Sequence, residues 1–205
     1  MKNLNYIGEL LFALSANLDN FTVSATFGIR KIKISFFNNI LIAVISALGT
    51  YLSMTFGHVI GRFIPLAISN YIGSSILILI GLFIMKDFFK HDKKQKNDGT
   101  RPNKINSILN KSETADLDGS GSIDMKETAL LAAALTLNNF GFGIGSSITG
   151  LNIYITVFLT FIFSIISMSI GNIVGKSFIP KILCKFASLI SGLIIVVLGL
   201  YEMFV

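Results

Sequence analysis

Charged residues are scarce in this chain of 205 residues: Asp, Glu, Lys and Arg together make up 14%, whereas 52% of the residues are hydrophobic. Soluble domains carry about 25% charged residues, so this composition and a mean hydropathy of +0.72 indicate an integral membrane protein. The single cysteine, Cys184, excludes an internal disulfide framework. The net charge is +6, but the basic residues gather between apolar segments. We therefore expect the lipid bilayer, and no nucleic acid, as a partner.

The sequence also lacks the residue sets that common enzyme sites require. There is no Ser/His/Asp or Cys/His constellation and no phosphate-binding loop, and both histidines lie away from Asp19. The first apolar segment is too long for a cleaved signal peptide and has no small-x-small cleavage site. We expect this segment to remain as the first membrane helix of a protein that is not an enzyme.

Six apolar segments reach the ~20 residues that a membrane-spanning helix needs. The polar stretch 90–126 separates two groups of three segments, in 1–89 and in 127–205. The short connections elsewhere predict that consecutive helices pack as antiparallel hairpins. The fold class is thus an all-α membrane protein with six transmembrane helices, at about 6–28, 35–58, 68–88, 127–149, 152–174 and 184–204.

The basic residues predict the orientation in the cell membrane. All of the 17 Lys and Arg residues except Lys2 and Arg62 fall on one side of the predicted bundle, in the first, third and fifth connections. Cytoplasmic loops carry the excess of Lys and Arg. We therefore expect both termini outside and the long polar stretch in the cytoplasm.

A four-residue sequence motif that occurs twice, called the repeated phrase below, relates the two groups of helices. Leu18-Asp19-Asn20-Phe21 returns as 137–140 (Leu-Asn-Asn-Phe), and 53–57 (Ser-Met-Thr-Phe-Gly) returns as 167–171 (Ser-Met-Ser-Ile-Gly). Because each repeat has three helices, the second must enter the membrane from the opposite side. Inverted repeats are a common plan of transporters, with the substrate near the midplane. A duplicated bundle that serves only as a scaffold is the alternative.

The repeated phrases supply the candidate transport site. A carboxylate in a membrane helix is costly unless it faces a protein interior, a partner or an ion. If the first and fourth helices meet, one carboxylate and three amide oxygens come together, and hard divalent cations such as Mg²⁺ and Mn²⁺ favour oxygen ligands. The alternative is that the amides only bond neighbouring helices. The site residues are Asp19, Asn20, Asn138 and Asn139.

The polar stretch contains a second candidate site, over 116–127 (Asp-Leu-Asp-Gly-Ser-Gly-Ser-Ile-Asp-Met-Lys-Glu). This spacing resembles the twelve-residue calcium loop of EF-hands, with Gly121 at the sharp turn. We expect Ca²⁺ or another divalent cation to bind there weakly. The alternative is a capping box of Asp124 and Glu127 at the start of the fourth helix. The predicted ligands are Asp116, Asp118, Ser120, Ser122, Asp124 and Glu127.

The twice-used phrase, the three-plus-three helices and the intervening loop together resemble the MntP-type manganese efflux family. Within it, the acidic stretch 116–121 just before the fourth helix makes the chain look like the YtaF-type sporulation membrane proteins. The resemblance covers nearly the whole chain and implies a six-helix protein of the lysine-exporter type. The efflux pumps carry an Asp in both repeats, whereas this chain matches at Asp19 and departs at Asn138.

Two functions follow as expectations. The first is export of a divalent cation, with Mn²⁺ as the candidate substrate, through a pocket around Asp19. The second is a non-transporting membrane component of spore formation with a cation-binding loop at 116–127. Amino-acid export ranks below both, because no paired charges suited to a zwitterion lie at the midplane. The sequence leaves open whether the chain forms a homo-oligomer.

Overall fold

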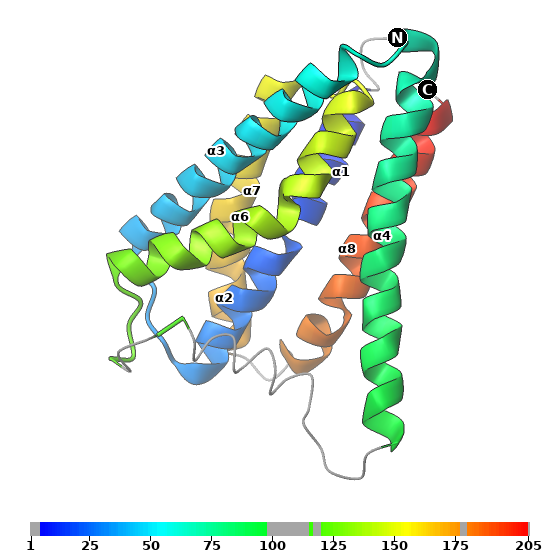
Figure 1. Cartoon of the computed structure of the whole chain (residues 1–205). Coiled ribbons are helices and arrows are strands. Elements are labelled where there is room, and N and C mark those ends of the chain that lie inside the picture. The colour runs from blue at the N-terminus through cyan, green and yellow to red at the C-terminus, as the bar shows by residue number, and fades with distance from the viewer. Residues whose placement is uncertain (1–4, 98–114, 117–119, 177–179, 205) are drawn as a thin grey trace.

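The computed structural model describes residues 5–97, 115–116, 120–176 and 180–204. This part of the chain is almost wholly helical, with one isolated parallel β-bridge between Lys33 and Ser122. Figure 1 shows the helices as a single elongated bundle. The helices are α1 (Asn5–Ala16), α2 (Leu18–Arg30), α3 (Phe36–Gly61), α4 (Leu66–Asn97), α6 (Met125–Ile148), α7 (Ile153–Gly175) and α8 (Pro180–Phe204).

Polar residues at the N-caps determine where three of the helices begin. Ser35 accepts a hydrogen bond from the backbone of Asn38 at the start of α3, and Asn152 accepts two at the start of α7. Asp124 and Glu127 form a complete capping box at the start of α6. These caps satisfy backbone N–H groups that have no partner within their own helix.

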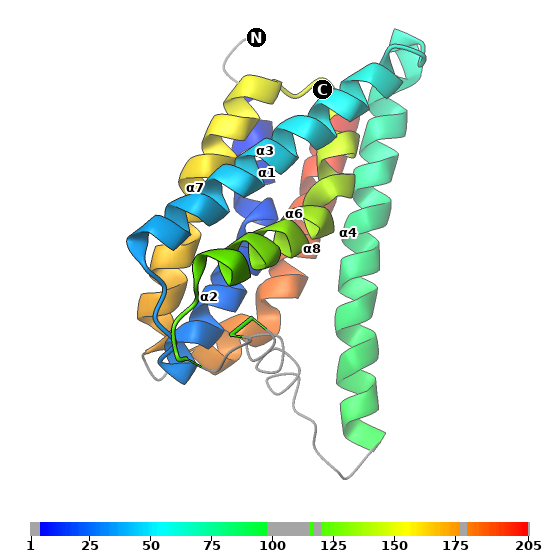
Figure 2. The same cartoon turned by 60° about the vertical axis from the view of Figure 1, so that its left-hand side comes forward.

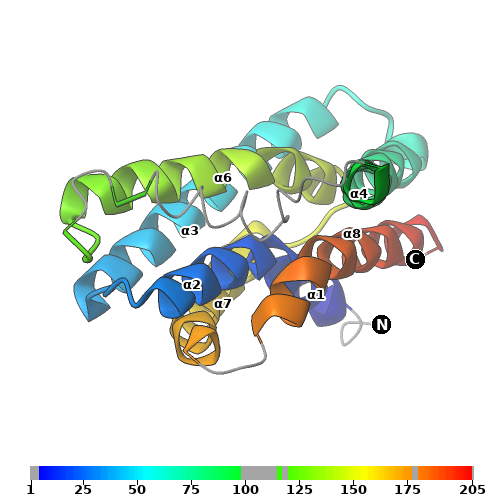
Figure 3. The same cartoon turned by 90° about the horizontal axis from the view of Figure 1, so that it is seen from below.

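The helices of the two halves interlock. The main packing pairs are α3 with α6, α2 with α7 and α4 with α8, each of which joins one half of the chain to the other. Viewed from below, α4 and α8 lie side by side at one edge of the bundle (Figure 3). The expectation that consecutive helices form packed hairpins is therefore wrong: such neighbours contribute little to the contacts of the described residues.

Each of the six predicted segments coincides with helical structure, but not all are uninterrupted apolar spans. In the described part of the chain, α3 and α7 are long and apolar enough to cross a membrane. Helix α6 is a third span if its two arms, which meet at 44° near Asn138, are counted together. The first segment is broken at Asn17 into α1 and α2. This is a multi-pass helical membrane protein.

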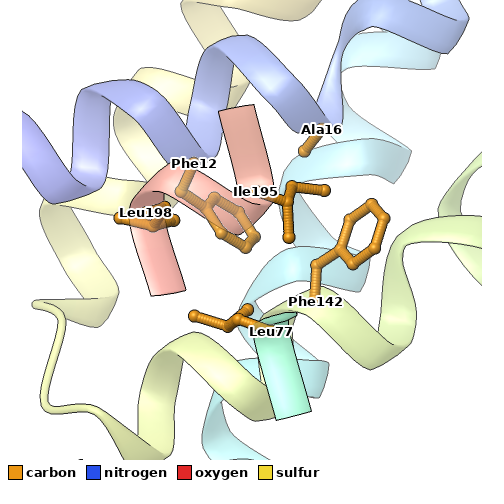
Figure 4. Packing of buried hydrophobic residues seen from close by; sticks show 6 residues of the cluster. All are labelled: Phe12, Ala16, Leu77, Phe142, Ile195 and Leu198. Atoms are coloured by element: carbon orange, nitrogen blue, oxygen red, sulfur yellow. The ribbon is translucent and has the colours of Figure 1, made fainter. Parts of the chain in front are cut away.

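A buried apolar cluster holds α1 against three other helices (Figure 4). Phe12 and Ala16 of α1 meet Leu77 of α4, Phe142 of α6, and Ile195 of α8 with its neighbour Leu198. Ala16 is the last residue of α1, so this cluster fixes the end of α1 beside α6. The start of α1 and the end of α8 lie at the same end of the bundle, as Figures 1 and 2 show.

Candidate functional site

The break between α1 and α2 is produced by Asn17. In a continuous helix the Ala13 carbonyl would accept the backbone N–H of Asn17. Here that N–H donates to the Leu14 carbonyl at 3.3 Å, and the Asn17 side-chain amide donates to the Ala13 carbonyl at 2.7 Å. The backbone of Asn17 has φ −107° and ψ 5°, outside the helical region. An asparagine side chain thus replaces the helical hydrogen bond and allows the chain to turn.

A residue from the second half of the chain satisfies a backbone carbonyl that this break leaves without its helical partner. Asn139 of α6 donates its side-chain amide to the Ala16 carbonyl at 2.6 Å. The backbone N–H of Asn20 donates to Oδ1 of Asp19 at 2.8 Å. Backbone groups that an uninterrupted helix would pair with one another are therefore satisfied by residues of the two repeated phrases.

Asp19 and Asn139 lie in contact, as the sequence predicts for a meeting of the first and fourth helices. The Asn139 amide is 3.3 Å from Oδ2 of Asp19, and both side chains are half-buried. The side chain of Asn138 lies outside the described residues. The structure therefore brings together three of the four predicted site residues.

Asn20 lies deeper than Asp19 and is 1% exposed. Its amide nitrogen donates to Oδ1 of Asn17 at 2.8 Å and to Oγ of Ser164 at 3.0 Å. Its Oδ1 is buried without a hydrogen-bond partner among the described residues. A buried acceptor of this kind is uncommon, and an amide oxygen is a ligand that hard cations accept.

A small polar cavity lies beside the break. Two of the side chains that line it, Thr136 and Thr160, have buried hydroxyl groups without a partner in the described part of the chain. Hydroxyl and amide oxygens of this kind suit water or a hard cation. The lining residues are Ala16, Asn17, Ser46, Gly49, Thr50, Ser53, Thr136, Asn139 and Thr160.

Sequence reasoning missed the hydroxyl residues that α3 and α7 contribute here, although the repeat contained the signal. The offset that aligns Ser53 with Ser167 also aligns Ser46 with Thr160, and Thr50 with Ser164. Within each helix these residues are four apart and therefore share a face. Pairs of hydroxyl residues at matching positions in the two repeats could have indicated that both repeats line one cavity.

The acidic stretch forms a compact turn. The carboxylate of Asp116 accepts hydrogen bonds from the backbone of Ser120 and of Gly121, each at 3.0 Å, and Gly121 has φ +75°. Such a φ favours glycine, as expected at the sharp turn of the loop. The predicted ligand Asp118 lies outside the described residues.

The other end of the turn carries the predicted capping box. The Glu127 backbone donates to Oδ1 of Asp124 at 2.8 Å, and the Asp124 backbone donates to Oε2 of Glu127 at 2.9 Å. The carbonyl of Ser122, a predicted ligand, accepts the hydroxyl of Ser120 at 2.9 Å. Within the described residues no three acidic, His or Cys side chains gather as a metal site.

The fold and the pocket define a class, namely multi-pass helical membrane proteins with a polar pocket at a helix break. A family model described as "Mntp: Putative manganese efflux pump" matches residues 1–85 and 66–203. "Probable sporulation protein YtaF" of Bacillus subtilis (strain 168) is 33% identical over 211 residues, which are 98% of this chain and 100% of that relative. The chain therefore belongs to the Mntp family of membrane cation exporters. No solved structure matches it.

Proposed function

We propose that this protein exports a divalent cation, with Mn²⁺ as the candidate substrate, through the pocket beside the α1–α2 break. The observation that carries the proposal is the contact of Asn139 with Asp19 and with the Ala16 carbonyl. Transporters of known mechanism bind ions where discontinuous helices meet near the membrane midplane. Here the break in α1–α2 faces the bend in α6.

The residues around the break favour a hard cation that binds weakly. Asp19 offers one carboxylate, and Asn20 offers an amide oxygen without a partner in the described chain. Carboxylate, amide and hydroxyl oxygens are the ligands that Mn²⁺ and Mg²⁺ prefer. One carboxylate neutralises only half of a divalent charge. Weak binding suits an exporter, because the ion must also leave.

Packing between α3 and α6, and between α7 and α2, supports the inverted repeat. A Cβ atom on Gly57 would lie 2.6 Å from the Ile144 carbonyl oxygen, and one on Gly171 would lie 2.6 Å from the Phe21 carbonyl oxygen and 3.1 Å from the Ala25 nitrogen. The repeated phrases align Ile144 with Ala25 as they align Asn138 with Asp19. The two close crossings are thus counterparts, as a two-fold relation between the halves requires.

The contact between α4 and α8 supports the same relation. A Cβ atom on Gly81 would lie 2.8 Å from the Gly192 carbonyl oxygen, and one on Gly199 would lie 3.0 Å from the Ser74 carbonyl oxygen. The offset that aligns Gly81 with Gly199 also aligns Ser74 with Gly192. Two three-helix repeats that enter the membrane from opposite sides would have this arrangement.

The charge distribution supports the predicted orientation of the chain in the membrane. The ends of α2, α4 and α7 point toward the same end of the bundle, opposite the start of α1 (Figure 1). Arg30, Lys31 and Lys176 are at these ends. With basic residues facing the cytoplasm, both termini would face outward, and export would carry the cation toward that side.

Manganese retention in a manganese-sensitive bacterial host tests the proposal. Cells that express the wild-type chain should hold less manganese than cells with Asp19→Asn at equal membrane levels, and Asn138→Asp should lower manganese further. Equal retention in wild-type and Asp19→Asn cells would remove the export function.

A second candidate is a non-transporting role in spore formation. Asn138, where the resembling efflux pumps carry a second Asp, favours this candidate, and the relative from Bacillus subtilis is described as a sporulation protein. Deletion would then impair sporulation without changing cellular manganese. If wild-type chain leaves manganese unchanged but Asn138→Asp lowers it, the pocket is intact and this chain has lost the pump.

A further inference from the structure

A pair of acidic side chains lies away from the pocket, at the end of the bundle where α1 begins and α8 ends. Glu9 is in the second turn of α1, and Glu202 is in the last turn of α8. From Glu9 to Asn17 is about 12 Å along α1 at 1.5 Å per residue. The pair is therefore separate from Asp19.

Glu9 is buried and only partly satisfied. Its side chain is 1% exposed. Oε1 accepts the backbone N–H of Asn152 at 3.2 Å, at the N-cap of α7. Oε2 is buried and has no hydrogen-bond partner among the described residues. An ionised carboxylate in this position is costly unless it gains a proton or a cation.

Glu202 brings a second carboxylate to the same place. It is half-buried, and the Glu9 carboxyl group lies near enough to interact with it electrostatically. Its Oε1 occupies the space over Gly8, because a Cβ atom on Gly8 would lie 2.6 Å from that oxygen. A side chain at residue 8 would therefore displace the Glu202 carboxylate from the position it occupies beside the residue that precedes Glu9. Neighbouring carboxylates repel each other, and a cation bound between them offsets that repulsion.

We propose that Glu9 and Glu202 bind one divalent cation at this end of the bundle. Two carboxylates balance the charge of such an ion, and the unpartnered Oε2 of Glu9 is a ready ligand. The site does not depend on transport through the Asp19 pocket. If the termini face outward, as the proposed function has it, the site lies on the outer side.

Direct binding of Mn²⁺ to the purified full-length chain in lipid nanodiscs tests this site. Bound Mn²⁺ loses the sharp electron paramagnetic resonance signal of the free ion, so titration counts sites and gives their affinities. Glu9→Gln and Glu202→Gln should each weaken one binding step by about tenfold or more. Asp19→Asn should leave that step unchanged. Glu113→Gln, which removes a carboxylate from the polar stretch, is the matched control.

The proposal fails if the folded Glu202→Gln chain binds Mn²⁺ as the wild type does. Glu202 is less buried than Glu9, so this variant keeps the test valid if Glu9→Gln does not fold. The alternative is that the two carboxyl groups only share a proton. Wild type would then show an infrared band of a protonated carboxyl group that Glu202→Gln abolishes, while Mn²⁺ binding stays unchanged. This result too would overturn the cation site. If Asp19→Asn removes a different Mn²⁺-binding step, that result concerns the export pocket and not the site of Glu9 and Glu202.

Discussion

The side-chain amide of Asn139 donates to the main-chain carbonyl of Ala16 at 2.6 Å. This hydrogen bond joins α6 to the last residue of α1, at the point where the first helix is interrupted. The same amide lies 3.3 Å from the Asp19 carboxylate. The break and the candidate ligand are thus held by one side chain from the other half of the protein.

Asn139→Ala should both destabilise the protein and reduce efflux. The buried Ala16 carbonyl would lose its partner, which costs about 1–3 kcal/mol in the free energy of unfolding. Asp19 would lose a donor that orients it. Thermal unfolding in detergent measures the first effect, and manganese retention at matched expression measures the second.

Asn39→Ala is the control for this prediction. Asn39 is buried, its amide joins α3 to α7 by donating to Oγ of Ser169 at 3.0 Å, and it does not line the pocket. This variant should lose comparable stability and keep its efflux. If both variants lose efflux in proportion to stability, Asn139 has a structural role only.

Thr160→Val should weaken transport without weakening the fold. The Thr160 hydroxyl lines the cavity and is buried without a partner among the described residues. Replacing it by a methyl group of similar shape leaves no hydrogen bond broken, so the free energy of unfolding should hold or rise. Efflux should fall if this oxygen assists the cation. Initial rates of manganese efflux from loaded vesicles provide the measurement.

Thr156 lies one turn earlier on the same helix, and Thr156→Val is the control variant for Thr160→Val. Thr156 is fully buried, and its hydroxyl donates to the Asn152 carbonyl at 2.7 Å. Its loss should cost about 1 kcal/mol and leave efflux unchanged. A Thr160→Val chain with wild-type rates would exclude that hydroxyl from the cation path.

The sequence predicts more of the fold than of the site. Hydropathy locates all six helical segments, because a membrane span must be apolar over its whole length, but it ends the third at 88, whereas α4 continues through polar residues to Asn97. It does not locate the break at Asn17, since one asparagine changes little in an apolar average. The repeated phrase predicts the meeting of Asp19 with Asn139. The hydroxyl lining of Thr50 and Thr160 was missed because serine and threonine are common in membrane helices as packing residues.

The hairpin prediction failed for a different reason. Short connections require consecutive helices to be near each other only at their linked ends. Small residues then decide which helices pack along their length. Gly57 and Gly171 admit the backbones of α6 and α2, so the halves interlock.

The acidic turn should respond to calcium if it is a cation site. Ca²⁺ should raise the unfolding temperature of the wild-type chain, and Asp118→Ala should abolish the rise, because binding to the folded state alone stabilises it. Asp124→Ala should lower stability by about 1 kcal/mol even without calcium, since it removes the N-cap of α6. An unfolding temperature that is the same with calcium and with a chelator would leave only the capping role.

Gly57→Ala should disrupt the crossing of α3 with α6. Its Cβ atom would lie 2.6 Å from the carbonyl oxygen and 2.8 Å from the Cα of Ile144, and backbone atoms cannot move aside as a side chain can. Gly61→Ala on the same helix is the matched control, because its Cβ atom would meet only a side-chain atom of Ile148 at 4.0 Å. Alanine stabilises a helix by up to about 1 kcal/mol relative to glycine, so Gly61→Ala should hold or raise the unfolding temperature while Gly57→Ala lowers it. Equal unfolding temperatures for the two variants would show that α6 does not approach α3 at Gly57.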